Sequence, residues 1–178
     1  MEMQAVLDFW FKESTPEQWF TKDEAFDETI RERFGELHGK VAQGEKASWR
    51  ETIQGRLAEI IVLDQFSRNL FRNDPRSFAY DGMALVLAQE ALANELDQLT
   101  VQERSFLYMP FMHSESLLIH QQALKLFSEE GMEENLDFEK RHQEIIQRFG
   151  RYPHRNSVLQ RVSTEEELLF LTEPNSSF

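Results

Sequence analysis

Apolar residues recur at intervals of three and four along nearly the whole chain, and the alternation typical of strands is rare. This spacing places the apolar side chains on one face of a helix, so it predicts an all-α protein. Capping residues, prolines and glycines divide the pattern into about eight helices. We expect helices over residues 3–12, 16–20, 23–44, 49–71, 78–96, 101–129, 137–149 and 164–171.

Three local signals refine these helices. The run IIVL (60–63) is apolar on every side, which only a helix surrounded by neighbours tolerates. Pro110 lies inside the helix over 101–129 and should kink or divide it, and Gly150 is a natural end for the helix over 137–149. We also expect a short helix from Asn156 to Arg161. Since neither a linker nor a repeat is evident, residues 1–178 should form a single helical domain, with 172–178 as a C-terminal tail.

Composition excludes several classes of function. The net charge of −13 repels nucleic acid and anionic membranes. The absence of cysteine excludes disulfides, thiolate metal sites and cysteine nucleophiles. The chain begins without the pattern of a signal peptide and contains no apolar run long enough to span a bilayer. We therefore expect a soluble cytoplasmic protein with a Phe-rich core, which binds neither nucleic acid nor membrane.

Two stretches concentrate positive charge in this acidic chain. Three of its thirteen arginines lie between Arg68 and Arg76, and four lie between Arg148 and Arg161, where there is no Asp or Glu. Arginine is suited to the bidentate binding of a carboxylate or phosphate, whether that group belongs to the protein or to a ligand.

One of these stretches lies on the central helix. Asp64, Arg68 and Arg72 are spaced by four and share a row that continues into the apolar face. The simplest interpretation is an Asp–Arg pair at a helix end. An alternative is that the charged end of this row, which continues the buried apolar face, forms part of a binding site.

Histidines occupy apolar faces of the later helices. His113 and His120 lie on the apolar face of the helix over 101–129, and His142 lies on that of the helix over 137–149. A single buried histidine is usually a satisfied core residue. Three on consecutive helices, followed at once by His154, predict that these imidazoles converge.

The segment RFGRYPHRN (148–156) places Arg148, Arg151, His154, Arg155 and Asn156 around a turn with free backbone donors. If a helix begins at Asn156, its N-terminus also attracts anions. The alternative is that these side chains only tie the loop to an acidic domain.

The segments LDQFSRNLFR (63–72), YMPFMHSES (108–116) and RFGRYPHRN (148–156) resemble motifs of the bacterial domain of unknown function 924 family. VLDFWF (6–11) and FAYDGMA (78–84) extend the resemblance, although Ser67 and Gln160 depart from the residues common in the family. The resemblance implies a tetratricopeptide-like right-handed superhelix of antiparallel helix pairs, and a function that is not established. Matching positions also single out Asn69, Asp81 and Ser114.

The first functional hypothesis is a pocket that binds a carboxylate or phosphate of a peptide end or a small metabolite. Its own tail, ending in Phe178, is a candidate occupant, unless these last residues are frayed. The residues expected to bind the ligand are Asp64, Gln65, Arg68, Arg72, His113, Glu115, His142, Arg148, Arg151, His154, Arg155 and Asn156.

Three alternatives stay open. One is an enzyme, such as a hydrolase of an anionic substrate, whose acid and base are drawn from His113, Glu115, His142, His154 and Asp64, although no known catalytic signature is present. Another is a metal site formed by the histidines, which the crowded arginines disfavour, so that neither a metal nor a cofactor is predicted. The last is a purely structural network of buried polar groups. The sequence makes no prediction of oligomeric state.

Overall fold

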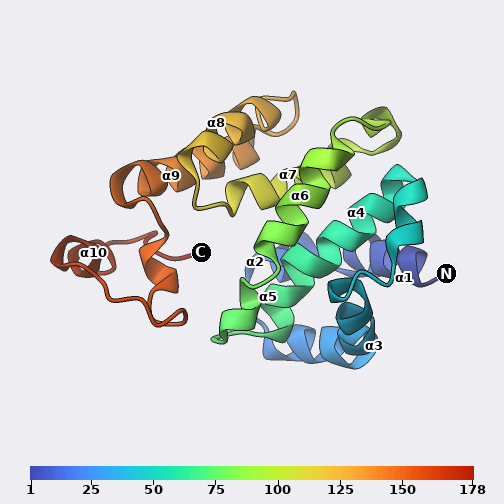
Figure 1. Ribbon diagram of the computed structural model, residues 1–178, viewed down its shortest axis with the longest axis horizontal. Coiled ribbons are helices and arrows are strands. Elements are labelled where there is room, and N and C mark those ends of the chain that lie inside the picture. The colour runs from blue at the N-terminus through green and yellow to red at the C-terminus, as the bar shows by residue number, and fades with distance from the viewer.

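The computed structural model describes residues 1–178, and it is helical without any strand. Figure 1 shows α4 and α6 side by side through the middle, α3 and α5 below them, and α8 to α10 on the left. The α-helices are α1 (Glu2–Asp8), α2 (Pro16–Phe20), α3 (Glu24–Ala42), α4 (Ile53–Ile61), α5 (Ser67–Leu70), α6 (Asp81–Ala91), α7 (Val101–Met112), α8 (Leu117–Leu126), α9 (Glu133–Phe149) and α10 (Glu165–Phe170). The predicted all-α class is confirmed.

Helix starts follow the capping signals in the sequence. Thr15, Thr100 and Thr164 each accept a hydrogen bond from a backbone N–H in the first turn, and each belongs to a reciprocal capping box. Gly150 ends α9 in the left-handed conformation, with a φ of 70° that a residue without Cβ adopts freely.

Near the site, one prediction is confirmed and one is corrected. The helix over 101–129 is divided as predicted, because α7 ends at Met112 and α8 begins at Leu117. Pro110 lies inside α7, where its missing N–H weakens the last turn, and the chain breaks shortly after it. The expected helix from Asn156 is wrong. A 3-10 helix, Pro153–Arg155, leads into a turn, and the left-handed Gln160 (φ 55°) ends the turn before a regular helix can form. The anion-attracting dipole expected at Asn156 is lost with it.

The central helical region contains a widened turn. α4 continues into a π-helical segment, Val62–Phe66, and then into α5, so the chain stays helical through the middle of the fold. Such turns shift the side chains that follow and are frequent at functional sites. This turn carries Asp64 and Gln65.

Consecutive helices pack on one another from α6 to α9, and α4 packs on both α6 and α7. The packing buries one main core of 31 hydrophobic residues, in which Trp10, Phe66 and Phe106 are among the largest. A smaller cluster lies beneath the C-terminal segment and includes Tyr152 and Phe170. The superhelix implied by the family resemblance stays a prediction.

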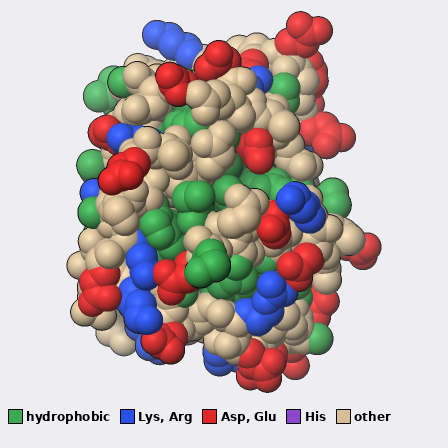
Figure 2. Space-filling model, turned by 90° about the vertical axis from the view of Figure 1, so that its right-hand side faces the viewer, with side chains coloured by type: hydrophobic (Ala, Val, Ile, Leu, Met, Phe, Trp, Pro, Cys, Tyr) green, Lys and Arg blue, Asp and Glu red, His purple; other side chains and the backbone are tan.

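On the face at the right of Figure 1, hydrophobic side chains gather in the middle, and acidic and basic side chains are mixed around them (Figure 2). No helix combines the length and the apolar character that crossing a membrane requires.

Candidate functional site

Five ionisable side chains from distant segments meet where α5, α6, α7 and the C-terminal loop come together. Asp64 lies in the π-helical turn, Arg68 on α5, Asp81 at the start of α6, His113 directly after α7, and Arg155 at the end of the 3-10 helix. We call these five residues the central cluster.

The carboxylate of Asp64 is fully buried and fully hydrogen-bonded. Its Oδ1 lies 2.7 Å from Nδ1 of His113, and its Oδ2 accepts a hydrogen bond of 2.7 Å from the amide of Gln65. Burial alone favours protonation, but the hydrogen bonds from His113 and Gln65 and the charge of Arg68 outweigh it and lower the pKa of Asp64 to about 2. The pKa of His113 is lowered by burial and by Arg68. At neutral pH the pair is therefore a carboxylate and a neutral imidazole whose Nδ1–H donates to Asp64.

Arg68 links the two carboxylates of the cluster. Its guanidinium donates to both oxygens of Asp81, at 2.9 and 3.0 Å, and to the backbone oxygen of Asp64 at 2.8 Å. Burial lowers the pKa of Arg68, but the two carboxylates outweigh this effect and the net pKa is raised. The cation of Arg68 is thus fully compensated within the chain.

Arg155 is compensated much less. Its side chain is 5% exposed, and its guanidinium carbon lies 4.4 Å from the ring centroid of Phe78 and 4.7 Å from that of Tyr152. Nη2 donates to the backbone oxygen of His113 at 3.0 Å, and Nε has no partner. The carboxylate paired with it, that of Asp81, is 3.6 Å from Nη1.

The pKa of Arg155 reflects the same imbalance. Burial and the neighbouring Arg68 lower it, and the carboxylates of Asp81 and Glu115, which raise it, do not outweigh them. A buried cation in this state favours any anion that can reach it.

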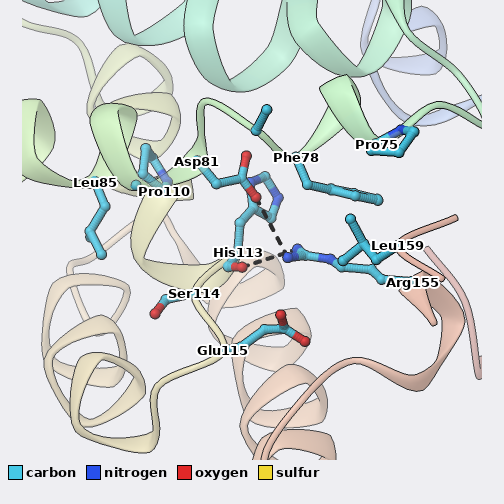
Figure 3. A pocket seen from close by; sticks show the side chains of 12 residues that line it. Pro75, Phe78, Asp81, Leu85, Pro110, His113, Ser114, Glu115, Arg155 and Leu159 are labelled. Carbon is cyan, nitrogen blue, oxygen red and sulfur yellow. Dashed lines mark hydrogen bonds and ion pairs between the residues drawn. The ribbon is translucent and has the colours of Figure 1, made fainter. Parts of the chain in front are cut away.

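A cleft of about 470 Å³ opens over this part of the cluster. Figure 3 shows Arg155 pointing across it toward Asp81 and the backbone of His113, with Phe78 on one side and Glu115 on the other. The lining residues are Pro75, Phe78, Ala79, Asp81, Gly82, Leu85, Pro110, His113, Ser114, Glu115, Arg155 and Leu159.

Glu115 ties the C-terminal loop to the break between α7 and α8. Its two oxygens accept hydrogen bonds of 2.9 and 3.0 Å from Arg161, and one also accepts 2.7 Å from the backbone N–H of Tyr152. Burial favours protonation, but these donors lower the pKa of Glu115, which is therefore ionised and already engaged.

The arginines at the start of the loop have partners of their own. Arg151 donates to both oxygens of Glu167, at 2.7 and 2.8 Å, and Asn156 donates to the same carboxylate at 3.1 Å. Arg148 pairs with Glu166 at the surface, where both side chains are more than 40% exposed. These contacts match the structural alternative for Arg148, Arg151 and Asn156.

Arg72 lies outside the central cluster. It pairs with Asp27 of α3 through two hydrogen bonds, and Asn69 donates to the same carboxylate at 2.9 Å. The row on the central helix therefore diverges: Asp64 and Arg68 point to the cluster, whereas Arg72 anchors α3.

His142 and His154 belong to an aromatic group around Phe178. His142, Tyr152 and His154 surround the ring of Phe178, at centroid distances of 3.9, 5.3 and 4.5 Å. Burial lowers the pKa of both histidines to about 3, so they are neutral. That the arginines also hold a carboxylate of the tail stays a prediction.

His120 is a structural residue of the core. It is fully buried, lies 2.5 Å from Glu139 through Nδ1, and contacts the backbone oxygen of Ser114 and the hydroxyl of Tyr152 through Nε2. No group of three or more His, Asp and Glu side chains has an arrangement that could hold a metal ion.

The family model described as bacterial protein of unknown function (DUF924) matches residues 6–175. The chain belongs to this family. A solved structure of a protein of unknown function from Agrobacterium tumefaciens is similar at 38% identity and a TM-score of 0.90, covering 95% of this chain and 96% of that one. No curated protein matches the sequence.

Some site residues of this DUF924 chain could not be found from helical periodicity. Asp81 was indicated only by the family resemblance, because it opens a helix and shows no pattern of its own. Arg161 had a signal, since it closes the arginine-rich stretch that lacks acidic residues. The stacking of Phe78 and Tyr152 on Arg155 had none, because it joins segments that are far apart in the sequence.

Proposed function

We propose that the cleft beside Arg155 binds the carboxylate or phosphate group of a small ligand. The carrying observation is the state of this guanidinium: it is buried, stacked between two rings, and without a carboxylate at hydrogen-bond distance. The arginines of the other networks, Arg68, Arg151 and Arg161, each have a bidentate carboxylate partner.

An anion in the cleft supplies the hydrogen-bonded anionic partner that Arg155 lacks within the chain. Hydrogen bonds to a charged group contribute about 1.5–3 kcal/mol when both partners are desolvated. The stacked rings fix the plane of the guanidinium in advance, so little side-chain entropy is lost on binding. The volume of about 470 Å³ is in the range of small-molecule sites.

The test is the titration of the protein with propanoate and with inorganic phosphate, followed by calorimetry or NMR. Arg155→Gln should weaken the binding of at least one of these anions by about tenfold or more, which corresponds to about 1.4 kcal/mol. Arg148→Gln is the matched control, because Arg148 belongs to the same stretch but lies at the surface. Equal affinities in the three proteins would overturn the proposal.

A second variant tests the cleft without changing the cluster. Gly82 lines the cleft, and a Cβ at this position meets no atom within 4 Å. Gly82→Leu should therefore fold normally, with a gain in helix propensity, and should obstruct the ligand. Retained affinity in this variant would place the bound anion elsewhere.

One observation favours an enzyme as the second candidate. His113 lines the same cleft, its Nδ1–H is held by a buried carboxylate, and its Nε2 has no partner in the chain. A neutral imidazole oriented in this way can act as a general base, as in catalytic triads. It could take a proton from a water molecule that attacks the acyl or phosphoryl centre of an anion held by Arg155, and return the proton to the leaving group.

This candidate is tested with anionic esters and phosphoesters as probe substrates. Turnover should fall by at least about a hundredfold in His113→Gln, and should be retained in Arg148→Gln. Turnover that is unaffected by His113→Gln excludes this residue as the base and leaves a binding role.

A further inference from the structure

The ring of Phe178 occupies a pocket with three aromatic walls. The ring centroid of His142 lies 3.9 Å from it, with the planes tilted by 50°, and Tyr152 and His154 meet it nearly edge-on, at 87° and 66°. We call His142, Tyr152 and His154 the aromatic pocket. The segment before Phe178 is also held, since the hydroxyl of Ser176 donates to the backbone oxygen of Leu171 at 3.2 Å.

The walls of the aromatic pocket are uncharged, and hydrogen bonds fix two of them, His142 and Tyr152. Burial keeps His142 and His154 neutral, with a pKa of about 3 for each. Nδ1–H of His142 donates to the backbone oxygen of Phe138 at 2.6 Å, and the hydroxyl of Tyr152 donates to the backbone oxygen of Met112 at 2.6 Å. With their polar atoms engaged in this way, these two rings offer flat faces and edges that suit another aromatic ring.

The aromatic pocket lies next to Arg155, although none of its three walls is among the residues that line the anion cleft. The ring of Tyr152 contacts Phe178 and also the guanidinium of Arg155, whose carbon lies 4.7 Å from its centroid. His154 is the residue next to Arg155 in the same 3-10 helix. An aromatic ring in the place of Phe178 would therefore be separated from Arg155 by one residue, Tyr152.

Phe178 is only partly buried in the aromatic pocket. It remains 55% exposed, so its docking removes less than half of its surface from water, in contrast to the fully buried Phe66 and Phe106 of the core.

We propose that the aromatic pocket is a subsite of the anion cleft for the ring of an aromatic carboxylate, and that Phe178 occupies this subsite until such a ligand displaces it. The ring part of this inference stands on the aromatic pocket alone, and the carboxylate part rests on the proposed function of Arg155. Two consequences follow: aromatic acids bind more tightly than aliphatic acids of similar length, and removing the Phe178 ring increases that preference.

The experiment compares 3-phenylpropanoate with propanoate on the full chain. If Phe178 occupies the pocket about nine-tenths of the time, Phe178→Ala should increase the affinity for 3-phenylpropanoate by about tenfold, because the apparent affinity scales with the fraction of open sites. The affinity for propanoate should not change. Phe20→Ala is the matched control, since Phe20 is another exposed phenylalanine, at 67%, and its ring packs on Trp19 and Phe106, away from the aromatic pocket.

A neutral ring separates the two proposals. Benzyl alcohol should bind Phe178→Ala more tightly than the unaltered protein, and should shift the ring resonances of His142 and His154, independently of Arg155. If propanoate binding depends on Arg155 but Phe178→Ala changes the affinity of neither 3-phenylpropanoate nor benzyl alcohol, the subsite is overturned and the anion cleft stands. If benzyl alcohol responds as expected but no anion binds, the aromatic pocket stands and the proposed function fails. If no probe binds, both are overturned.

Discussion

The fully buried carboxylate of Asp64 lies 2.7 Å from Nδ1 of His113 and fixes the imidazole so that its second nitrogen is left without a partner in the chain. Because Asp64 is ionised, the Nδ1 proton belongs to His113, and Nε2 is the free acceptor. The pair joins a π-helical turn to the residue that follows α7, so that a fully buried carboxylate orients a histidine that lines the cleft.

Asp64→Asn tests this pairing. The carboxylate raises the pKa of His113 against the effects of burial and Arg68, so its neutralisation should lower that pKa further, as measured by NMR titration of the imidazole. Since Arg68 also loses part of its compensation, the free energy of unfolding should fall by about 3 kcal/mol. Asp137 is the control, because it is exposed and its side chain makes no hydrogen bond or ion pair, so Asp137→Asn should leave both quantities as they are. A pKa of His113 that does not change would contradict the arrangement.

Arg72 should contribute to the stability of the fold but not to ligand binding. Arg72→Gln breaks two hydrogen bonds to Asp27, and this should lower the free energy of unfolding by about 2 kcal/mol. The affinity for propanoate should not change, since Arg72 does not line the cleft. Urea unfolding and anion titration of the same variant check both parts, and a loss of affinity in a folded Arg72→Gln protein would argue against two separate networks.

Acid should destabilise the fold through its neutral histidines. His142 and His154 have a pKa of about 3 in the folded protein, against the ordinary value of about 6.5 for an accessible imidazole. Between these values the unfolded chain binds protons that the folded chain excludes. This contribution to stability is therefore complete above about pH 6.5 and decreases as the pH falls, by about 1.4 kcal/mol per unit for each histidine.

The range between pH 6.5 and 5 isolates this effect, because the unfolded carboxylates are still ionised there. Urea unfolding at several pH values should show a shallower slope for His142→Gln than for the unaltered protein. The same slope in both would mean that His142 is protonated in the folded state.

Gly55 should be indispensable at its position. A Cβ on this residue of α4 would overlap the carbonyl group of Trp49, which is backbone and cannot move aside. Gly55→Ala should lower the melting temperature by several degrees, as expected for about 2 kcal/mol or more of strain. Gly39→Ala in α3 meets no atom and should be neutral or stabilising by about 0.5–1 kcal/mol. Thermal unfolding of the two variants makes the comparison, and equal melting temperatures would count against the packing of α4 on Trp49.

The sequence predicted the helices well where local chemistry decides them. The caps at Thr100 and Thr164 and the stop at Gly150 depend on neighbouring residues alone, and each is confirmed. The helix expected from Asn156 does not form, because tertiary contacts determine the backbone conformation there. The side chain of Asn156 is hydrogen-bonded to Glu167 and Ser163, and Gln160 has a left-handed backbone conformation. Such tertiary contacts are not visible in periodicity.

In the site, too, local patterns were predicted correctly and tertiary contacts were not. Asp64 and His113 were placed on apolar faces by helical spacing, and burial on those faces is confirmed. Spacing could not tell that the next residue in the row, Arg72, turns to α3, or that Glu115 is engaged by Arg161. Which arginine lacks a partner depends on the distribution of acidic side chains in three dimensions, and so only the structure singles out Arg155.

The binding of an anion to Arg155 is tested most directly by the NMR signal of its own Nε–H, followed while propanoate is added to the labelled protein. This nitrogen is buried and has no partner in the chain, so its resonance reports on the guanidinium without competition from water. Anion binding at Arg155 should produce a saturable shift of the Arg155 signal and none of the Arg148 signal. A signal of Arg155 that stays in place while the anion binds, or through the whole titration, would contradict binding at this residue.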